Sequence, residues 1–235
     1  MFAFQLLSAL SSAALMVAAA PAGLAPPRPG GFAPSTCSTA AAKMDLPAGQ
    51  TQLVSPTTAP LFVALGVGVQ NYTCSASTLK YTSTGAVASL FDISCLDTTP
   101  AFASVQTLGY AAWKALPASV TADDLGAKIG APVLLGYHYF VTSPSGTGIS
   151  PKWDFTSTGK LAGNSSAFFL GTKVGDITDA ANTAVNVDWL ALNNVQGSLA
   201  SKVFRVDTVN GQPPTSCVAG SPDISVKYTA KYFLY

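Results

Sequence analysis

The chain has 235 residues, of which 49% are hydrophobic and only 10% are charged, and its formal net charge is +1. A charged fraction this far below the soluble average, together with many Gly, Pro, Ser and Thr residues, is typical of a single β-sandwich or β-barrel of this length. With 12 basic residues against 11 acidic ones and no dense basic patch, the sequence argues against nucleic acid as a partner.

Residues 1–22 have the composition of a secretory signal peptide. They are apolar, carry no charged side chain and end in small residues, and a cut after Ala22 avoids a proline directly behind the cleavage site. The alternative is an uncleaved anchor of about 20 apolar residues. No later stretch is apolar for long enough to span a membrane. The sequence therefore predicts export to the extracellular space or cell wall, with no stable membrane span after cleavage.

Four cysteines and two glycosylation sequons agree with export. The cysteines are Cys37, Cys74, Cys95 and Cys217. An even number in an oxidising compartment predicts two disulfides, for which three pairings are possible. The sequons begin at Asn71 and Asn164. Asn164 lies in a GNSS turn and is the better acceptor of a glycan, whereas Asn71 lies inside a predicted strand. For both, the alternative is that the sequon occurs by chance and is not glycosylated.

Residues 23–60 form a Pro-, Ala- and Ser-rich lead-in, expected to be extended and mobile because its prolines exclude a helix or central strand. From residue 61 onward, alternating apolar residues predict a series of strands. These are 61–74, 78–82, 87–93, 131–141, 151–155, 166–174, 185–192, 198–209 and 223–235. Such a series indicates one mainly β domain, 61–235: an antiparallel sandwich or a closed barrel of about eight strands.

The segment 101–128 interrupts this pattern and predicts a short helical insertion. Apolar residues from Val105 to Leu116 follow each other at spacings of three and four, as in a helix. The helix is expected to break at Pro117. Ser119, followed shortly by two aspartates, is expected to start a second short helix.

Several strings beyond residue 60 resemble a family of secreted proteins of unknown function from fungi and bacterial envelopes. The strings are GVGVQNYTC, LFD, HY, PKWDF, VDWLAL, KVFRVDTVNGQPPTSC and VKYTAKYFLY. The resemblance covers roughly residues 60–235 and brings no established activity. Bacterial members carry cysteines corresponding to Cys74 and Cys217 and have little between LFD and HY. The resemblance therefore implies the pairs Cys74–Cys217 and Cys37–Cys95, and a local pairing of Cys74 with Cys95 stays open.

Fungal members of that family are often labelled malate dehydrogenase, and the residues argue against this label. A nicotinamide site needs G-x-G-x-x-G between a strand and a helix. The nearest match places Asn71 where the third glycine should stand, and a strand run follows. Beyond the signal peptide, the only arginines available for a dicarboxylate are Arg28 and Arg205. We expect no NAD and no other cofactor.

The stretch 136–155 is the best candidate for side-chain chemistry because it holds the only histidine, His138. Paired with an aspartate such as Asp154, His138 would serve as the base of a hydrolase or lyase. We favour the alternative, a histidine hydrogen-bonded inside the sheet, because no G-x-S-x-G nucleophile motif accompanies it. Alternation places His138 on the face opposite Tyr139.

Metal and glycosidase chemistry have weaker support. With one histidine and oxidised cysteines, only carboxylates and carbonyls remain as ligands, and no calcium loop occurs, so no metal site is expected. The chain has no glutamate. The aspartates Asp154 and Asp188 each lie next to a tryptophan, and alternation would put acid and indole on opposite faces, which disfavours a carboxylate pair around a sugar.

Arg205 and Asp207 are two residues apart on one predicted strand and are expected to share a face, as a structural ion pair. The functional alternative is a charge at the mouth of a cavity, where it fixes a ligand's carboxylate or hydroxyl. Aromatic side chains would line that cavity in a barrel, or fill the core in a sandwich. The candidate ligand-binding residues are His138, Tyr139, Trp153, Trp189 and Arg205.

The sequence thus favours a non-enzymatic module that binds a small apolar or aromatic molecule or a glycan. A hydrolase or lyase centred on His138 is one alternative. A structural surface protein without a ligand is the other. Nothing in the sequence indicates an oligomeric state.

Overall fold

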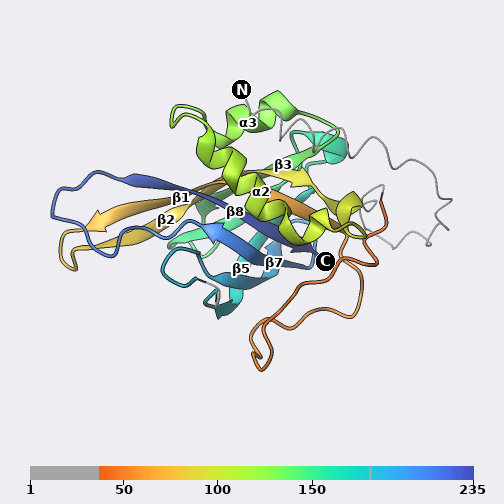
Figure 1. The fold of residues 1–235 in the computed structure, drawn as a ribbon, viewed down its shortest axis with the longest axis horizontal. Helices are drawn as coiled ribbons and strands as arrows, with labels where there is room; N and C mark the ends of the chain where they lie inside the picture. Colours follow the sequence, from red (N-terminus) through yellow and green to blue (C-terminus); the bar gives the residue numbers. More distant parts are fainter. Residues whose placement is uncertain (1–36, 180–181) are drawn as a thin grey trace.

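The computed structural model describes residues 37–179 and 182–235, so the predicted signal peptide lies outside the described residues (Figure 1). Within these residues, eight antiparallel strands follow each other around a closed barrel, and β8 pairs with β1 to close it. The strands are β1 Phe62–Ser75, β2 Lys80–Asp92, β3 Leu134–Thr142, β4 Ile149–Asp154, β5 Phe168–Ile177, β6 Trp189–Gln196, β7 Lys202–Asn210 and β8 Ile224–Leu234. The mainly β prediction is confirmed, and the barrel is the form adopted.

The strand β2 joins two runs that the sequence predicts as separate strands, 78–82 and 87–93. Gly85 lies between them with φ of 118°, at the point where the register between β1 and β2 shifts. Glycine adopts such a backbone conformation without a Cβ clash. The chain therefore passes through a β-bulge and continues along the same strand instead of turning.

Two helices cover one side of the barrel, α2 (Ala101–Ala115) and α3 (Ala122–Ile129) (Figure 1). They occupy the predicted helical insertion. The helix α2 packs against β1, β7 and β8, and its Trp113 donates a hydrogen bond from Nε1 to the carbonyl oxygen of Gly68 at 2.8 Å. In the described part of the chain, no helix has the length and apolarity needed to cross a bilayer.

The sequence predicts that the second helix starts at Ser119. In the structure this helix, α3, begins after Thr121. The Thr121 hydroxyl oxygen accepts a hydrogen bond from the Asp124 backbone N–H, and the Asp124 carboxylate accepts one from the Thr121 N–H. This reciprocal capping box satisfies backbone donors that the first turn of a helix leaves free.

Two disulfides hold segments distant in sequence. Cys37–Cys95 ties the lead-in to the 3-10 helix η1 (Ser94–Leu96), and Cys74–Cys217 joins β1 to the loop before β8. Both pairs implied by the resemblance are confirmed, and the local pairing of Cys74 with Cys95 does not occur. The described part of the lead-in also packs against the outer wall of the barrel, through Ala42, Met44 and Leu53.

The barrel wall separates an inner apolar cluster from an outer one. On β8, Tyr228, Ala230, Tyr232 and Leu234 belong to the inner cluster, as expected for alternate residues of one strand. The inward positions of β1 are small: a Cβ atom added at Gly66 would lie 2.4 Å from a ring carbon of Tyr232. The glycine therefore makes room for the Tyr232 ring inside the barrel.

Candidate functional site

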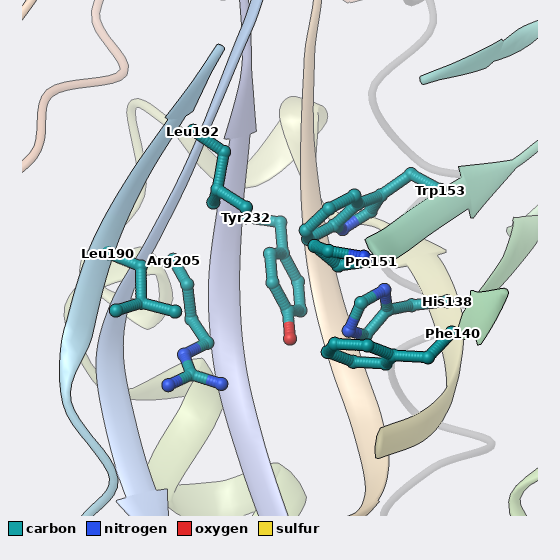
Figure 2. Close-up of a pocket in the computed structure, with 8 residues that line it drawn as sticks. All are labelled: His138, Phe140, Pro151, Trp153, Leu190, Leu192, Arg205 and Tyr232. Atoms are coloured by element: carbon teal, nitrogen blue, oxygen red, sulfur yellow. The ribbon is translucent and has the colours of Figure 1, made fainter. Parts of the chain in front are cut away.

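A cavity of about 30 Å³ lies inside the barrel, between side chains from β3 and β4 on one side and from β6, β7 and β8 on the other (Figure 2). The lining residues are His138, Phe140, Pro151, Trp153, Leu190, Leu192, Arg205 and Tyr232. Four of these are buried and form the floor: His138, Trp153, Leu192 and Tyr232. The other four are half-buried and form a rim toward solvent.

His138 and Trp153 are directly paired across β3 and β4, and their rings stack with centroids 4.2 Å apart at 21°. His138 Nδ1 lies 2.9 Å from the carbonyl oxygen of Lys152. A carbonyl oxygen only accepts hydrogen bonds, so Nδ1 carries the proton and Nε2 is left as an acceptor. Figure 2 shows the imidazole turned toward Tyr232 and Arg205.

Burial determines the charge of His138. Desolvation lowers its pKa from 6.5 to about 3; the hydrogen bond to Lys152 acts in the opposite direction, and the charge of Arg205 lowers the pKa further. His138 is therefore neutral near pH 7. Burial also raises the pKa of Tyr232, whose hydroxyl lies 2.9 Å from that of Tyr228. Arg205 is the charged group of the cavity.

Arg205 reaches the cavity from β7, and the backbone holds it there. Its Nε and Nη2 atoms donate hydrogen bonds to the carbonyl oxygen of Asp188, at 3.0 Å and 2.8 Å. Among the described residues, Arg205 forms no salt bridge. The Asp188 carboxyl has a raised pKa because of burial and the nearby charge of Asp176. The charge of Arg205 acts to lower the pKa of the Asp188 carboxyl, so the two groups interact without forming a salt bridge. The guanidinium is oriented by a neutral carbonyl acceptor.

Of the five predicted ligand-binding residues, His138, Trp153 and Arg205 come together at the cavity. Tyr139 and Trp189 do not. Tyr139 lies on the outer face of β3, where its hydroxyl donates to Asp154. Trp189 belongs to the outer apolar cluster. Both follow from the pleat, which sends neighbouring side chains to opposite faces of a strand.

The acid–base pair considered for His138 and Asp154 does not form. Asp154 is paired with Tyr137 across the two strands, and its carboxylate accepts hydrogen bonds on the outer face from Lys152 Nζ at 2.8 Å, the Tyr139 hydroxyl at 2.6 Å and Thr156 Oγ1 at 2.6 Å. Although burial acts to raise it, these hydrogen bonds hold the pKa of Asp154 well below its usual range. Asp154 is therefore a saturated structural carboxylate.

The expectation that Arg205 and Asp207 share a face is wrong. The pairing of β7 with β8 shifts between Val206 and Val209, and Asp207 has φ of 51°. Such a bulge adds a residue to one strand and resets the alternation of side chains. Asp207 therefore points outward, where its carboxylate lies 3.0 Å from Lys231 Nζ.

The sequence reasoning did not single out several lining residues: Phe140, Pro151, Leu190 and Leu192. Leu190 and Leu192 flank Ala191 in the VDWLAL string, and alternation alone puts them on the face opposite Trp189. Alternation does not show which strands enclose the same interior, so it could not assign these residues to the cavity. That assignment depends on closure of the barrel.

The two sequon asparagines lie in different surroundings. Asn164 is exposed in the turn between the 3-10 helix η2 (Gly159–Leu161) and β5, and its side-chain oxygen accepts from the Ser166 hydroxyl at 2.9 Å. Asn71 lies within β1, and its side-chain oxygen accepts from the Ser225 hydroxyl at 2.8 Å. Glycosylation at both positions stays a prediction, with Asn164 the more accessible.

The fold and the cavity define a class: a disulfide-linked, closed antiparallel barrel with a small, partly polar interior site. Residues 55–235, more than half of the chain, match the family described as protein of unknown function DUF3455. The chain belongs to this family. No curated protein and no solved structure matches the chain.

Proposed function

We propose that this protein is a secreted binding module that holds a small molecule at the cavity inside its barrel. The observation that carries the proposal is the convergence of His138, Trp153, Arg205 and Tyr232, from four strands, on one apolar hollow. Barrels of about eight strands have interiors wide enough for side chains or one small ligand. Small-molecule sites are mostly apolar hollows with a few placed polar groups.

The hydrogen bonding at the cavity supports a ligand. Trp153 is 2% exposed, and its Nε1 donor has no hydrogen-bond partner among the described residues. Buried polar groups in folded proteins are nearly always hydrogen-bonded, and each exception calls for an explanation. A bound molecule with an acceptor atom would satisfy this donor.

The arrangement of the tryptophans favours a small molecule over a glycan. Sugar binding by stacking needs an aromatic face open to solvent. Trp113, Trp153 and Trp189 are all buried, at 0%, 2% and 9% exposure. A hydrolase or lyase centred on His138 gains no support, because its partner is a carbonyl oxygen and its pKa of about 3 is too low for a base at neutral pH.

Two disulfides and the predicted signal peptide support the secreted location. Disulfides form and persist in oxidising compartments, such as the outside of the cell. The exposed turn at Asn164 is compatible with glycosylation during export. We place the module in the extracellular space or the cell wall.

The test is a titration with two probes, benzyl alcohol and benzoate, followed by the indole N–H resonance of Trp153 in NMR spectra. We expect a saturable shift with at least one probe. Leu190→Trp, which puts a bulky ring at the half-buried rim, should abolish the shift, whereas Val195→Trp on the exposed part of the same strand should preserve it. No shift with either probe would contradict the proposal.

A further inference from the structure

We propose that the ligand is a monocarboxylic acid whose carboxylate enters the cavity and binds Arg205, while its apolar body lies on the rim. This inference rests on the proposed binding function and adds the chemical class of the ligand. It follows from the unused hydrogen-bond donors, the charge and the size of the cavity.

The first argument is the incomplete bonding of Arg205. A guanidinium has five N–H donors, and two of them are used by the carbonyl oxygen of Asp188. The remaining donors are left for the Tyr232 hydroxyl beside it and for a ligand (Figure 2). The planar fork of a guanidinium fits the two oxygens of a carboxylate, which makes this a strong charge-assisted interaction.

The second argument is charge. Arg205 is half-buried and has no salt bridge within the described ranges, 37–179 and 182–235. A charge withdrawn from water is costly unless an opposite charge accompanies it. His138 is held neutral by burial and adds no second positive charge. The Asp188 carboxyl interacts with Arg205 but forms no salt bridge with it. One further negative charge therefore suffices at Arg205, which favours a monocarboxylate over a dicarboxylate.

The third argument comes from the donors of the floor. The Nε1 atom of Trp153 is a buried donor without a partner, and an indole N–H cannot accept. Together with Arg205, it makes the cavity rich in donors. A carboxylate supplies acceptors only, so it complements this side of the cavity. The neutral His138 contributes one acceptor, Nε2, which suits a ligand hydroxyl or a water molecule.

The size of the cavity limits which part of the ligand enters it. A cavity needs a volume of roughly 10–15 Å³ to hold one water molecule. Measured in the same way, this cavity has a volume of about 30 Å³. A carboxylate fits this space, whereas a six-membered ring does not. The body of the acid then lies on the half-buried rim formed by Phe140, Pro151 and Leu190, which are apolar side chains.

The experiment compares benzoate with benzyl alcohol, which share a ring and differ in the charge of the head group. On the wild-type protein, we expect benzoate to bind about tenfold more tightly or better, which is the usual gain from a charge-assisted hydrogen bond. Arg205→Met should remove this preference, because the variant lacks the planar fork that fits a carboxylate. A cooperative urea unfolding transition shows that the variant is folded.

Two further variants keep the test decisive. Arg205→Lys keeps the charge without the fork and should retain part of the benzoate preference. Lys202→Met removes an exposed positive charge from the same strand and should change neither affinity. An equal loss of benzoate binding in Lys202→Met would mean that net charge, and not Arg205, attracts the acid, and would overturn the inference.

The outcomes separate the inference from the proposed function. Equal binding of both probes, with no effect of Arg205→Met, would overturn the acid and leave a neutral small-molecule site. Absence of binding by either probe would overturn the binding function itself.

Discussion

Two cations, Arg205 and Lys231, stand on neighbouring strands and on opposite sides of the barrel wall. Lys231 points outward under α2, where its side chain is 4% exposed and its Nζ lies 3.0 Å from Asp207 and 4.5 Å from the centre of the Phe102 ring. Arg205 points inward to the cavity, where the Asp188 carbonyl oxygen and the Tyr232 hydroxyl lie beside its guanidinium. Lys231 forms a salt bridge within the fold, and Arg205 forms none with the described residues.

This difference separates a structural charge from the one that we propose binds a ligand. A buried ion pair is tolerated when both partners are present, and it becomes strongly destabilising when one is removed. Lys231 and Asp207 meet this condition inside the protein. Arg205 would meet it only with a ligand. The bulge on β7 creates the contrast, because it sends Asp207 to the outer face and away from Arg205.

The largest expected change in stability comes from breaking the salt bridge between Lys231 and Asp207. Asp207→Asn leaves the buried ammonium of Lys231 without its anion and should lower the free energy of unfolding by about 3–5 kcal/mol. Urea denaturation at pH 7 measures this value. The double variant Asp207→Leu with Lys231→Met should recover most of the loss, because it removes both charges. A loss below about 1 kcal/mol in Asp207→Asn would show that Lys231 does not depend on its partner.

The next-largest expected effect comes from protonation of His138, which would place a second positive charge beside Arg205. The pKa of His138 falls from 6.5 to about 3 on folding, so the unfolded chain takes up the proton first as the pH drops. Stability is therefore full above pH 6.5 and declines from there toward pH 3. Each pH unit in this window costs about 1.4 kcal/mol, or about 2–3 kcal/mol in total at pH 4.5.

His138→Phe, which keeps a ring against Trp153, should remove most of this decline in urea titrations at pH 7 and pH 4.5. Asp154→Asn is the matched control. The pKa of Asp154 is lowered from 3.8 on folding, so its contribution is present above pH 3.8 and is lost only below that value. The decline between pH 7 and pH 4.5 should therefore persist in Asp154→Asn. An unchanged decline in His138→Phe would assign it to other groups.

A smaller effect is expected for the cation of the cavity. Arg205→Met removes a half-buried charge that forms no salt bridge with the described residues, so its cost is that of the two hydrogen bonds with the Asp188 carbonyl and of the contact with the Tyr232 hydroxyl. We expect the free energy of unfolding to change by about 1 kcal/mol or less in ligand-free protein. A loss as large as that of Asp207→Asn would remove the distinction between the two cations.

The smallest change in stability is expected for an exposed ion pair, which serves as the reference for the buried charges. Lys173 and Asp176 form an ion pair on β5 in which the lysine side chain is 57% exposed. Exposed pairs contribute little, because water and salt screen them. Lys173→Met should therefore change the free energy of unfolding by less than about 0.5 kcal/mol. A larger change would show that the charges on β5 are more strongly coupled than their exposure indicates.

Part of the candidate site was predictable from residue types and alternation. His138, Trp153 and Arg205 stood out as the only histidine, a tryptophan of the same stretch 136–155 and one of two arginines beyond the signal peptide. Alternation correctly separated His138 from Tyr139 and Trp153 from Asp154. It failed for Asp207, because a single bulge inverts the faces of everything that follows it on the strand.

The sequence alone determined the class of fold and, through its four cysteines, the expectation of two disulfides. Period-two alternation marks strands because a pleated backbone turns successive side chains to opposite faces, and the three- and four-residue spacing marks the helices. The tertiary structure decided between sandwich and barrel, because closure depends on hydrogen bonds between β1 and β8, about 160 residues apart, which no local pattern encodes. Closure also decided which side chains meet. It brought Arg205 opposite His138 and left that arginine without a salt bridge to any described residue.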